Sequence, residues 1–202
     1  MATKDRNSKN IGIIILAAGT SARMGSAKQL LGYRGKSLLQ HSIDAALDSL
    51  AEQVIVVLGA RKEIIEQEID QSNIQLIENP LWESGMASSI QFGLKKLKMM
   101  LPEADGAIFM VCDQPFVNAE LLNKLIDKHI SSGKNIVASK YADTLGTPTL
   151  FHHSFFHELS MLKGDIGAKS LIKNYKNQTE SVEFQLGSID IDTRENYLNL
   201  PK

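Results

Sequence analysis

The residues best suited to chemistry lie in one stretch near the amino terminus, which reads Leu16-Ala17-Ala18-Gly19-Thr20-Ser21-Ala22-Arg23-Met24-Gly25-Ser26-Ala27-Lys28. The small side chains at 17–19 let a flat ligand approach the backbone, whose amides and carbonyls can then read its hydrogen-bonding edges. Arg23 carries a planar guanidinium that suits phosphate oxygens, and Lys28 carries a mobile charge. The pattern favours a loop that binds a nucleoside triphosphate, although an ordinary solvated loop can have the same composition.

Two better-known phosphate-binding loops do not fit this stretch. Gly19 and Gly25 have five residues between them and Ser26 follows, so the spacing of a P-loop and its Gly-Lys-Ser/Thr ending are both absent. The G-x-G-x-x-G pattern of dinucleotide-binding proteins is absent as well. A triphosphate site here would therefore belong to another class of loop.

Two acidic segments far along the chain could hold a metal ion. Asp113 follows a nearly continuous apolar run, so we expect it at the carboxyl edge of a sheet, where ligands bind. Asp190 and Asp192 share one face if their segment is extended, and Thr193 can cap a helix after them. Mg2+ usually takes one or two protein carboxylates and completes its shell with water and phosphate oxygens. A turn carboxylate and an acidic helix start are the alternatives without metal.

The elements that must position these residues alternate as in an α/β protein. Short apolar runs predict strands at 11–15, 53–58, 74–77, 107–111 and 135–139. Between them we predict helices that begin after Ser37, near Lys62, at Ser88 or Ser89, and after Asn118. This rhythm predicts a doubly wound, mostly parallel sheet flanked by helices, with ligands at the carboxyl ends of its strands. Shorter elements fill residues 141–187, which we expect to extend over one side of the site and to be able to move as a flap.

Length, charge and cysteine content narrow the function classes. The chain has 202 residues and a formal net charge of -1, which suits one domain over residues 10–202 and offers no basic field for a nucleic acid polymer or a membrane surface. Residues 1–9 read as a polar, mobile tail. The single cysteine, Cys112, excludes an internal disulfide framework and is compatible with a reducing cytoplasm. We expect a cytoplasmic protein with a small ligand.

Taken in order, the motifs resemble the MobA-like nucleotidyltransferases and, within them, the molybdenum cofactor cytidylyltransferase branch. The stretch 16–28 resembles the signature loop Leu-Ala-Ala-Gly-x-Ser-x-Arg-Met-Gly-x-x-Lys. Residues 79–89 match the segment Asn-Pro-x-Trp-x-x-Gly-Met-Ala-Ser-Ser, and Asp113-Gln114-Pro115 matches Asp-Gln-Pro, where guanylyl relatives typically carry Asp-Met-Pro. Residues 146–148 and 164–168 resemble family segments on the acceptor side. One departure is Cys112, which stands where the family usually has glycine.

The resemblance, which covers roughly residues 11–195, implies a Rossmann-like nucleotidyltransferase fold and a transfer of CMP from CTP to the terminal phosphate of molybdopterin cofactor. It implies Arg23, Lys28 and Asp113 as catalytic residues and a Mg2+ ion held by Asp113 and Asp192. The nucleotide-binding residues that it implies are Leu16, Ala17, Ala18, Gly19, Arg23, Lys28, Asn79, Gly85, Ser88, Ser89 and Asp113. A transient protein partner could deliver the labile pterin-phosphate acceptor.

Three other functions stay open on the sequence. Two are enzymatic: a guanylyltransferase of the same family, or a cytidylyltransferase acting on a sugar or polyol phosphate. The third is a nucleotide-binding sensor without turnover. Ala18, in place of the glycine of guanylyl relatives, and Gln114 favour CTP over GTP.

Overall fold

The computed structural model describes residues 10–21, 25 and 27–201. Arg23 and the expected tail 1–9 lie outside the described residues. Strands and helices alternate along most of the chain, as predicted. Among the described residues, every helix is too short or too polar to span a lipid bilayer.

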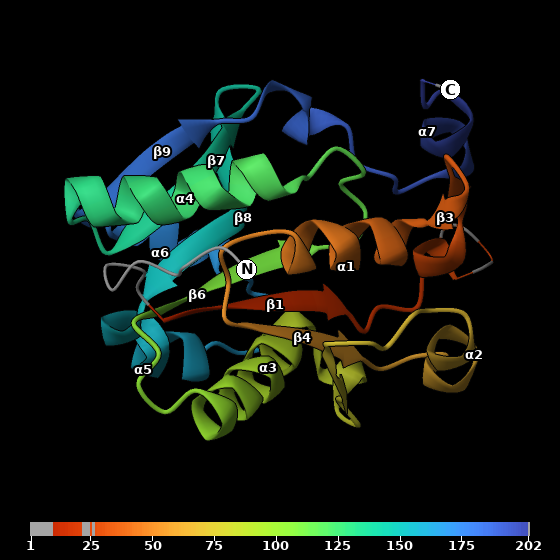
Figure 1. The fold of residues 1–202 in the computed structure, drawn as a ribbon, viewed down its shortest axis with the longest axis horizontal. Helices are drawn as coiled ribbons and strands as arrows, with labels where there is room; N and C mark the ends of the chain where they lie inside the picture. Colours follow the sequence, from red (N-terminus) through yellow and green to blue (C-terminus); the bar gives the residue numbers. More distant parts are fainter. Residues whose placement is uncertain (1–9, 22–24, 26, 202) are drawn as a thin grey trace, which may run out of the picture.

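A seven-stranded sheet forms the centre of the protein, with the order β5-β4-β1-β6-β8-β7-β9 (Figure 1). β8 is antiparallel to its neighbours β6 and β7, whereas the other neighbouring pairs are parallel. The predicted mostly parallel sheet is therefore confirmed. Its strands are β1 (Ile11–Ala17), β4 (Gln53–Leu58), β5 (Gln75–Glu78), β6 (Gly106–Val111), β7 (Ile136–Tyr141), β8 (Thr144–His152) and β9 (Thr179–Glu183).

Helices cover both faces of this sheet (Figure 1). On one face, residues of α1 (Leu38–Leu47) and α4 (Ala119–Ser132) pack in one cluster with Ile11, Ile13 and Ile15 of β1. On the other face, Ile14 packs in a cluster with residues of α3 (Met86–Met100), α5 (Phe156–Ser160) and α6 (Lys169–Asn174). Because both faces are covered, the apolar run of β1 has no polar alternation.

Smaller elements complete the chain. The hairpin β2 (Gly32–Tyr33) and β3 (Lys36–Ser37), α2 (Lys62–Gln67) and α7 (Arg194–Leu198) lie at the end of the molecule toward which β1 points (Figure 1). Short 3-10 helices are η2 (Lys28–Leu30), η3 (Trp82–Ser84), η4 (His153–Phe155), η5 (Lys176–Gln178) and η6 (Gln185–Ser188). The carboxyl ends of β1, β4 and β6 therefore open toward the segments that carry the candidate residues.

Most predicted helix starts are confirmed by their caps. The side chains of Ser37, Asn118 and Thr193 each accept a hydrogen bond from a backbone amide of the following turn. One start was wrong, since α3 begins at Met86 and not at Ser88 or Ser89. The first turn forms earlier because the amide of Ala87 donates to the carbonyl of Gly164, 3.0 Å away in a distant loop.

The segment 141–187 contributes two strands to the main sheet. β8 pairs with β6 on one side and β7 on the other, and β9 pairs with β7, so both strands belong to the main sheet. The part between them, residues 153–178, packs through α5 and α6 on the same face as α3. Movement of this part over the site stays a prediction.

Candidate active site

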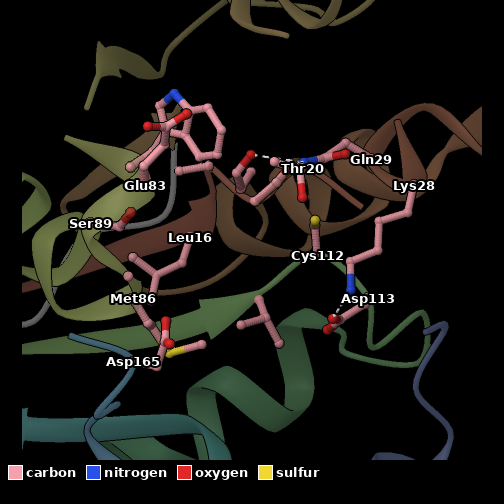
Figure 2. A pocket seen from close by; sticks show the side chains of 16 residues that line it. Leu16, Thr20, Lys28, Gln29, Glu83, Met86, Ser89, Cys112, Asp113 and Asp165 are labelled. Atoms are coloured by element: carbon pink, nitrogen blue, oxygen red, sulfur yellow. Dashed lines mark hydrogen bonds and ion pairs between the residues drawn. The ribbon is translucent and has the colours of Figure 1, made fainter. Parts of the chain in front are cut away.

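A cavity of about 350 Å3 lies at the carboxyl ends of β1 and β6. Glu83, Ser89 and Met86 lie on one side of it and Lys28 with Asp113 on the other (Figure 2). Its lining combines the signature loop, the segment before α3 and the end of β6. The residues are Leu16, Ala17, Ala18, Gly19, Thr20, Lys28, Gln29, Trp82, Glu83, Gly85, Met86, Ser89, Val111, Cys112, Asp113 and Asp165.

Gln29 holds the signature loop in shape. Its side chain is buried, and Nε2 lies 2.9 Å from the carbonyl oxygens of both Ala17 and Gly19. The hydroxyl of Ser21 donates to Oε1 of Gln29 and accepts from the backbone amide of Lys28, each over 3.1 Å. These side-chain hydrogen bonds therefore close the loop and fix the position of the Lys28 backbone.

Lys28 lies between the two carboxylates that the sequence singled out. Its Nζ atom is 2.6 Å from Oδ2 of Asp113 and 3.1 Å from Oδ1 of Asp192, although these partners are 85 and 164 positions away in the chain. Burial acts to lower the pKa of Lys28, but the attraction and hydrogen bonds of the two carboxylates outweigh it, so this pKa lies above its ordinary value. Lys28 is therefore a cation at neutral pH.

The backbone brings the two acidic segments together independently of Lys28. The amide of Ile191, between Asp190 and Asp192, donates to the carbonyl of Asp113 over 2.9 Å. Ile191 itself is fully buried, packed in a small cluster with Tyr33, Leu38 and Leu200. Both carboxylates are therefore fixed at their backbones next to one another.

The donor set fits one hard divalent cation. Two carboxylate oxygens lie within about 3 Å of a single nitrogen atom, so they are within about 6 Å of each other and can converge on one ion. The positively charged ammonium of Lys28 lies between these two oxygens. No group of three or more His, Cys, Asp and Glu side chains suited to a metal occurs among the described residues, so substrate oxygens and water would complete the shell.

Asn79 organises the opposite wall from behind. It is fully buried, and its Nδ2 atom lies 2.8 Å from Oγ of Ser88 and 2.9 Å from Oγ of Ser89. Its Oδ1 atom accepts from the amide of Leu81 over 2.9 Å. Of these residues only Ser89 lines the cavity. Asn79 and Ser88 therefore lie behind the wall, and their expected part in nucleotide binding stays a prediction.

Gly85 is where this wall meets the loop at 164–168. Its φ of 96° lies in the region that favours glycine, and a Cβ atom here would collide with the backbone of Gly164. Asp165, which follows, lines the cavity beside Met86 (Figure 2). The glycine-rich segment that resembles the acceptor side of the family thus forms part of the wall of this cavity.

A second, more apolar cavity of about 190 Å3 adjoins the first and shares Leu16, Met86 and Val111 with it. Its other walls come from β6, β7, β8, α3 and the start of α6. They are Ile90, Phe109, Tyr141, Gly146, Thr147, Thr149, Gly167, Ala168, Lys169 and Ile172. Two ligands could therefore lie end to end, one in each cavity.

Gln114 and Cys112 flank Asp113 in the chain. Gln114 is buried and lines neither cavity. Its Nε2 atom donates to the carbonyl of Gly187 over 2.9 Å, and its Oε1 atom accepts from the hydroxyl of Thr147 over 3.1 Å. Cys112 has no positive φ, so a side chain in place of the family's glycine leaves the backbone unstrained. Burial raises the pKa of its thiol to about 12.

The cavity brings together eight of the predicted nucleotide-binding residues, namely Leu16, Ala17, Ala18, Gly19, Lys28, Gly85, Ser89 and Asp113. Asp192 does not line the cavity but accepts a hydrogen bond from Lys28, which does. Arg23 lies outside the described residues. The sequence reasoning missed Gln29, Glu83 and Met86. Nothing local distinguishes a loop glutamine that binds distant carbonyls from a solvated one, whereas Glu83 and Met86 lie inside the segment 79–89, and that motif was a signal for both.

Comparison with known proteins gives a consistent result. Residues 13–180 match the family model of the MobA-like NTP transferase domain. Purine catabolism protein PucB of Bacillus subtilis is 28% identical over 91% of this chain and 92% of its own length. The crystal structure of Rv0371c from Mycobacterium tuberculosis is 30% identical, covers 95% of this chain and 96% of its own, and superposes with a TM-score of 0.81. Rv0371c has also been solved in complex with manganese, with 27% identity over 94% of this chain and 97% of its own, and a TM-score of 0.77.

Proposed function

Because the chain belongs to the MobA-like NTP transferases and is therefore a nucleotidyltransferase, we propose that it transfers CMP from CTP to the terminal phosphate of a molybdopterin cofactor. An oxygen of the acceptor phosphate attacks the α-phosphorus in line. The bond from that phosphorus to the bridging β-oxygen breaks, and pyrophosphate leaves with the electron pair. The product is a cytosine dinucleotide of the pterin. We place this reaction in the cytoplasm.

The single observation that carries the proposal is the Lys28, Asp113 and Asp192 cluster at one end of the cavity. In a phosphoryl transfer the protein contributes position and charge stabilisation more than covalent chemistry. Lys28 and Arg23 neutralise the phosphates of CTP. Asp113 and Asp192 would hold Mg2+, which would supply positive charge at the reacting phosphate. The manganese complex of Rv0371c supports a divalent ion in this family.

The opposite end of the cavity suits the base and ribose. It offers the backbone of 16–19, the hydroxyl of Ser89 and the carboxylates of Glu83 and Asp165. A carboxylate that accepts a hydrogen bond from an exocyclic amino group is one way to read cytosine. Ala18 and the Asp-Gln-Pro motif favour CTP, although Gln114 acts from behind the cavity by fixing Thr147 and the chain at Gly187.

The adjoining apolar cavity suits the acceptor. It shares Leu16, Met86 and Val111 with the first cavity, so an acceptor bound there would meet the nucleotide across this shared wall. Lys169 lies at its edge and could pair with an anionic group of the acceptor. A flat, partly apolar pterin fits such walls better than a sugar phosphate, which needs more polar partners.

Turnover with each nucleotide and each acceptor class tests the proposal. Pyrophosphate release is measured with CTP, GTP, UTP and ATP at matched concentrations, with molybdopterin cofactor, a sugar phosphate or a polyol phosphate as the acceptor. We expect release with CTP and the pterin acceptor. Equal or better use of GTP would assign a guanylyltransferase, and preference for a sugar or polyol phosphate would assign another acceptor. Binding of CTP without release for any acceptor would indicate a sensor.

A further inference from the structure

Resting on the proposed function, we infer that the ammonium of Lys28 holds the metal position between Asp113 and Asp192 until a nucleoside triphosphate draws it away. The divalent ion and the nucleotide then bind as one unit, and the nucleotide-free protein has little affinity for the ion. Lys28 is in this sense a built-in substitute for the metal as well as a phosphate ligand.

The first step of the argument is geometric. Nζ of Lys28 contacts one oxygen of each carboxylate, at 2.6 and 3.1 Å. A Mg2+ ion shared by the same two oxygens would need them at about 2.0–2.1 Å and would lie in the space that the ammonium fills. Two cations cannot occupy this space together, so metal entry requires that Nζ leaves.

The second step concerns which part can move. The carboxylate-bearing segments are joined by the hydrogen bond from the Ile191 amide to the Asp113 carbonyl, and Gln29 fixes the loop next to Lys28. The Lys28 side chain has four rotatable methylene units and no planar constraint. Its side chain is 19% exposed, against 18% for Asp113 and 33% for Asp192, so the cluster borders on solvent. The movable member of the cluster is the lysine.

The third step is the exchange of partners. An ammonium displaced from two carboxylates loses two charge-assisted hydrogen bonds unless other anionic oxygens replace them. The phosphates of a nucleotide in the adjoining cavity are such oxygens, because Lys28 also lines that cavity. The metal alone offers nothing to the displaced ammonium, whereas a metal with its nucleotide does. Binding of one therefore favours binding of the other, and by linkage the effect is reciprocal.

Metal binding by the nucleotide-free protein provides the test. Mn2+ is titrated into the full chain, and the free ion is measured by electron paramagnetic resonance, for the wild type and for Lys28→Met and Lys28→Gln. The glutamine variant keeps a hydrogen-bonding end between the carboxylates. It therefore provides the test if the methionine variant does not fold. Lys36→Met is the matched control, because Lys36 forms an exposed pair with Asp44 at 2.5 Å, in a part of the chain that does not line the cavity.

We expect both Lys28 variants to bind one Mn2+ at least about 10-fold more tightly than the wild type without nucleotide, and Lys36→Met to match the wild type. Adding a CTP analogue with a methylene group between the α- and β-phosphorus should raise the Mn2+ affinity of the wild type most. Equal Mn2+ affinity of wild type and Lys28 variants would overturn the inference. If wild type with the analogue still binds Mn2+ in that case, the proposed function stands; if it binds none, both fail.

Discussion

At one end of the cavity, the amide of Asn79 is fully buried and holds two serine hydroxyls through uncharged hydrogen bonds. At the other end, Lys28 holds two carboxylates that solvent still reaches. Breaking a buried neutral network leaves groups that nothing can satisfy, so such a network keeps one shape. A partly exposed ionic cluster can exchange partners at small cost, because water and phosphate oxygens replace what is lost. The first end therefore sets the form of the cavity, and the second can change during a reaction.

The largest effect is expected at the charged end. Asp113→Ala and Asp192→Ala should each lower turnover at least about 1000-fold, because each removes a carboxylate that we propose as a metal ligand beside the reacting phosphate. The double variant should lose little more than either single one, since both residues serve the same ion. The free energy of unfolding should change by less than about 1 kcal/mol, because Lys28 keeps one partner. Steady-state pyrophosphate release measures turnover, and thermal unfolding measures stability. Fully additive losses of turnover in the double variant would contradict a shared ion.

Arg23→Ala should lower turnover on the order of 100-fold, because it removes a planar donor from the developing phosphate charge. Stability should be nearly unaffected, because the role that we propose for Arg23 is to bind a ligand. The control is Arg23→Lys, which keeps the charge and loses the fork, and should recover part of the activity. Wild-type turnover of the purified alanine variant would mean that Arg23 contacts no phosphate.

Asn79→Ala probes the uncharged end, where stability should change more than chemistry. The variant removes the partner of the Ser89 hydroxyl and of the Leu81 amide, while Ser88 keeps the carbonyls of Leu81 and Gly85, so the protein should lose about 2–4 kcal/mol of stability. KM for the nucleotide should rise, with kcat at saturation reduced less than about 10-fold, because the cavity wall loosens while the charged cluster stays intact. Denaturant unfolding and initial rates measure this. Asn177→Ala, at an exposed asparagine, should change neither quantity.

The smallest effect concerns Cys112, which lies beside the charged end but takes no part in it. Its pKa of about 12 lies above the ordinary value of 9.0, so the reactive thiolate is scarce at pH 8. Alkylation by iodoacetamide at pH 8 should therefore be about 1000-fold slower than for an exposed cysteine, and the rate should rise with pH up to about 12. Mass spectrometry of the intact protein follows the reaction. Rapid labelling of the folded protein at pH 8 would contradict the burial.

Local signals in the sequence determined most of the fold. The β-branched runs of β1 and β4, the caps Ser37, Asn118 and Thr193, and the apolar run before Asp113 each act within a few residues, so each could be recognised without the rest of the chain. The same holds for the motif residues that line the cavity, since the carboxyl ends of parallel strands must meet at one edge. The start of α3 was misplaced because its first turn depends on Gly164.

Only the tertiary structure decided which polar side chains face a ligand and which hold the protein together. Asn79, Gln114 and Gln29 look alike in the sequence, as amides in loops near motifs. Asn79 and Gln114 are buried behind the cavity, whereas Gln29 lines it and also closes the signature loop. Lys28 lies between Asp113 and Asp192 because the fold joins positions 85 and 164 residues away. Hydrogen bonds and ion pairs form between groups that are close in space. The packed sheet sets these distances, and the neighbouring residues in the chain do not.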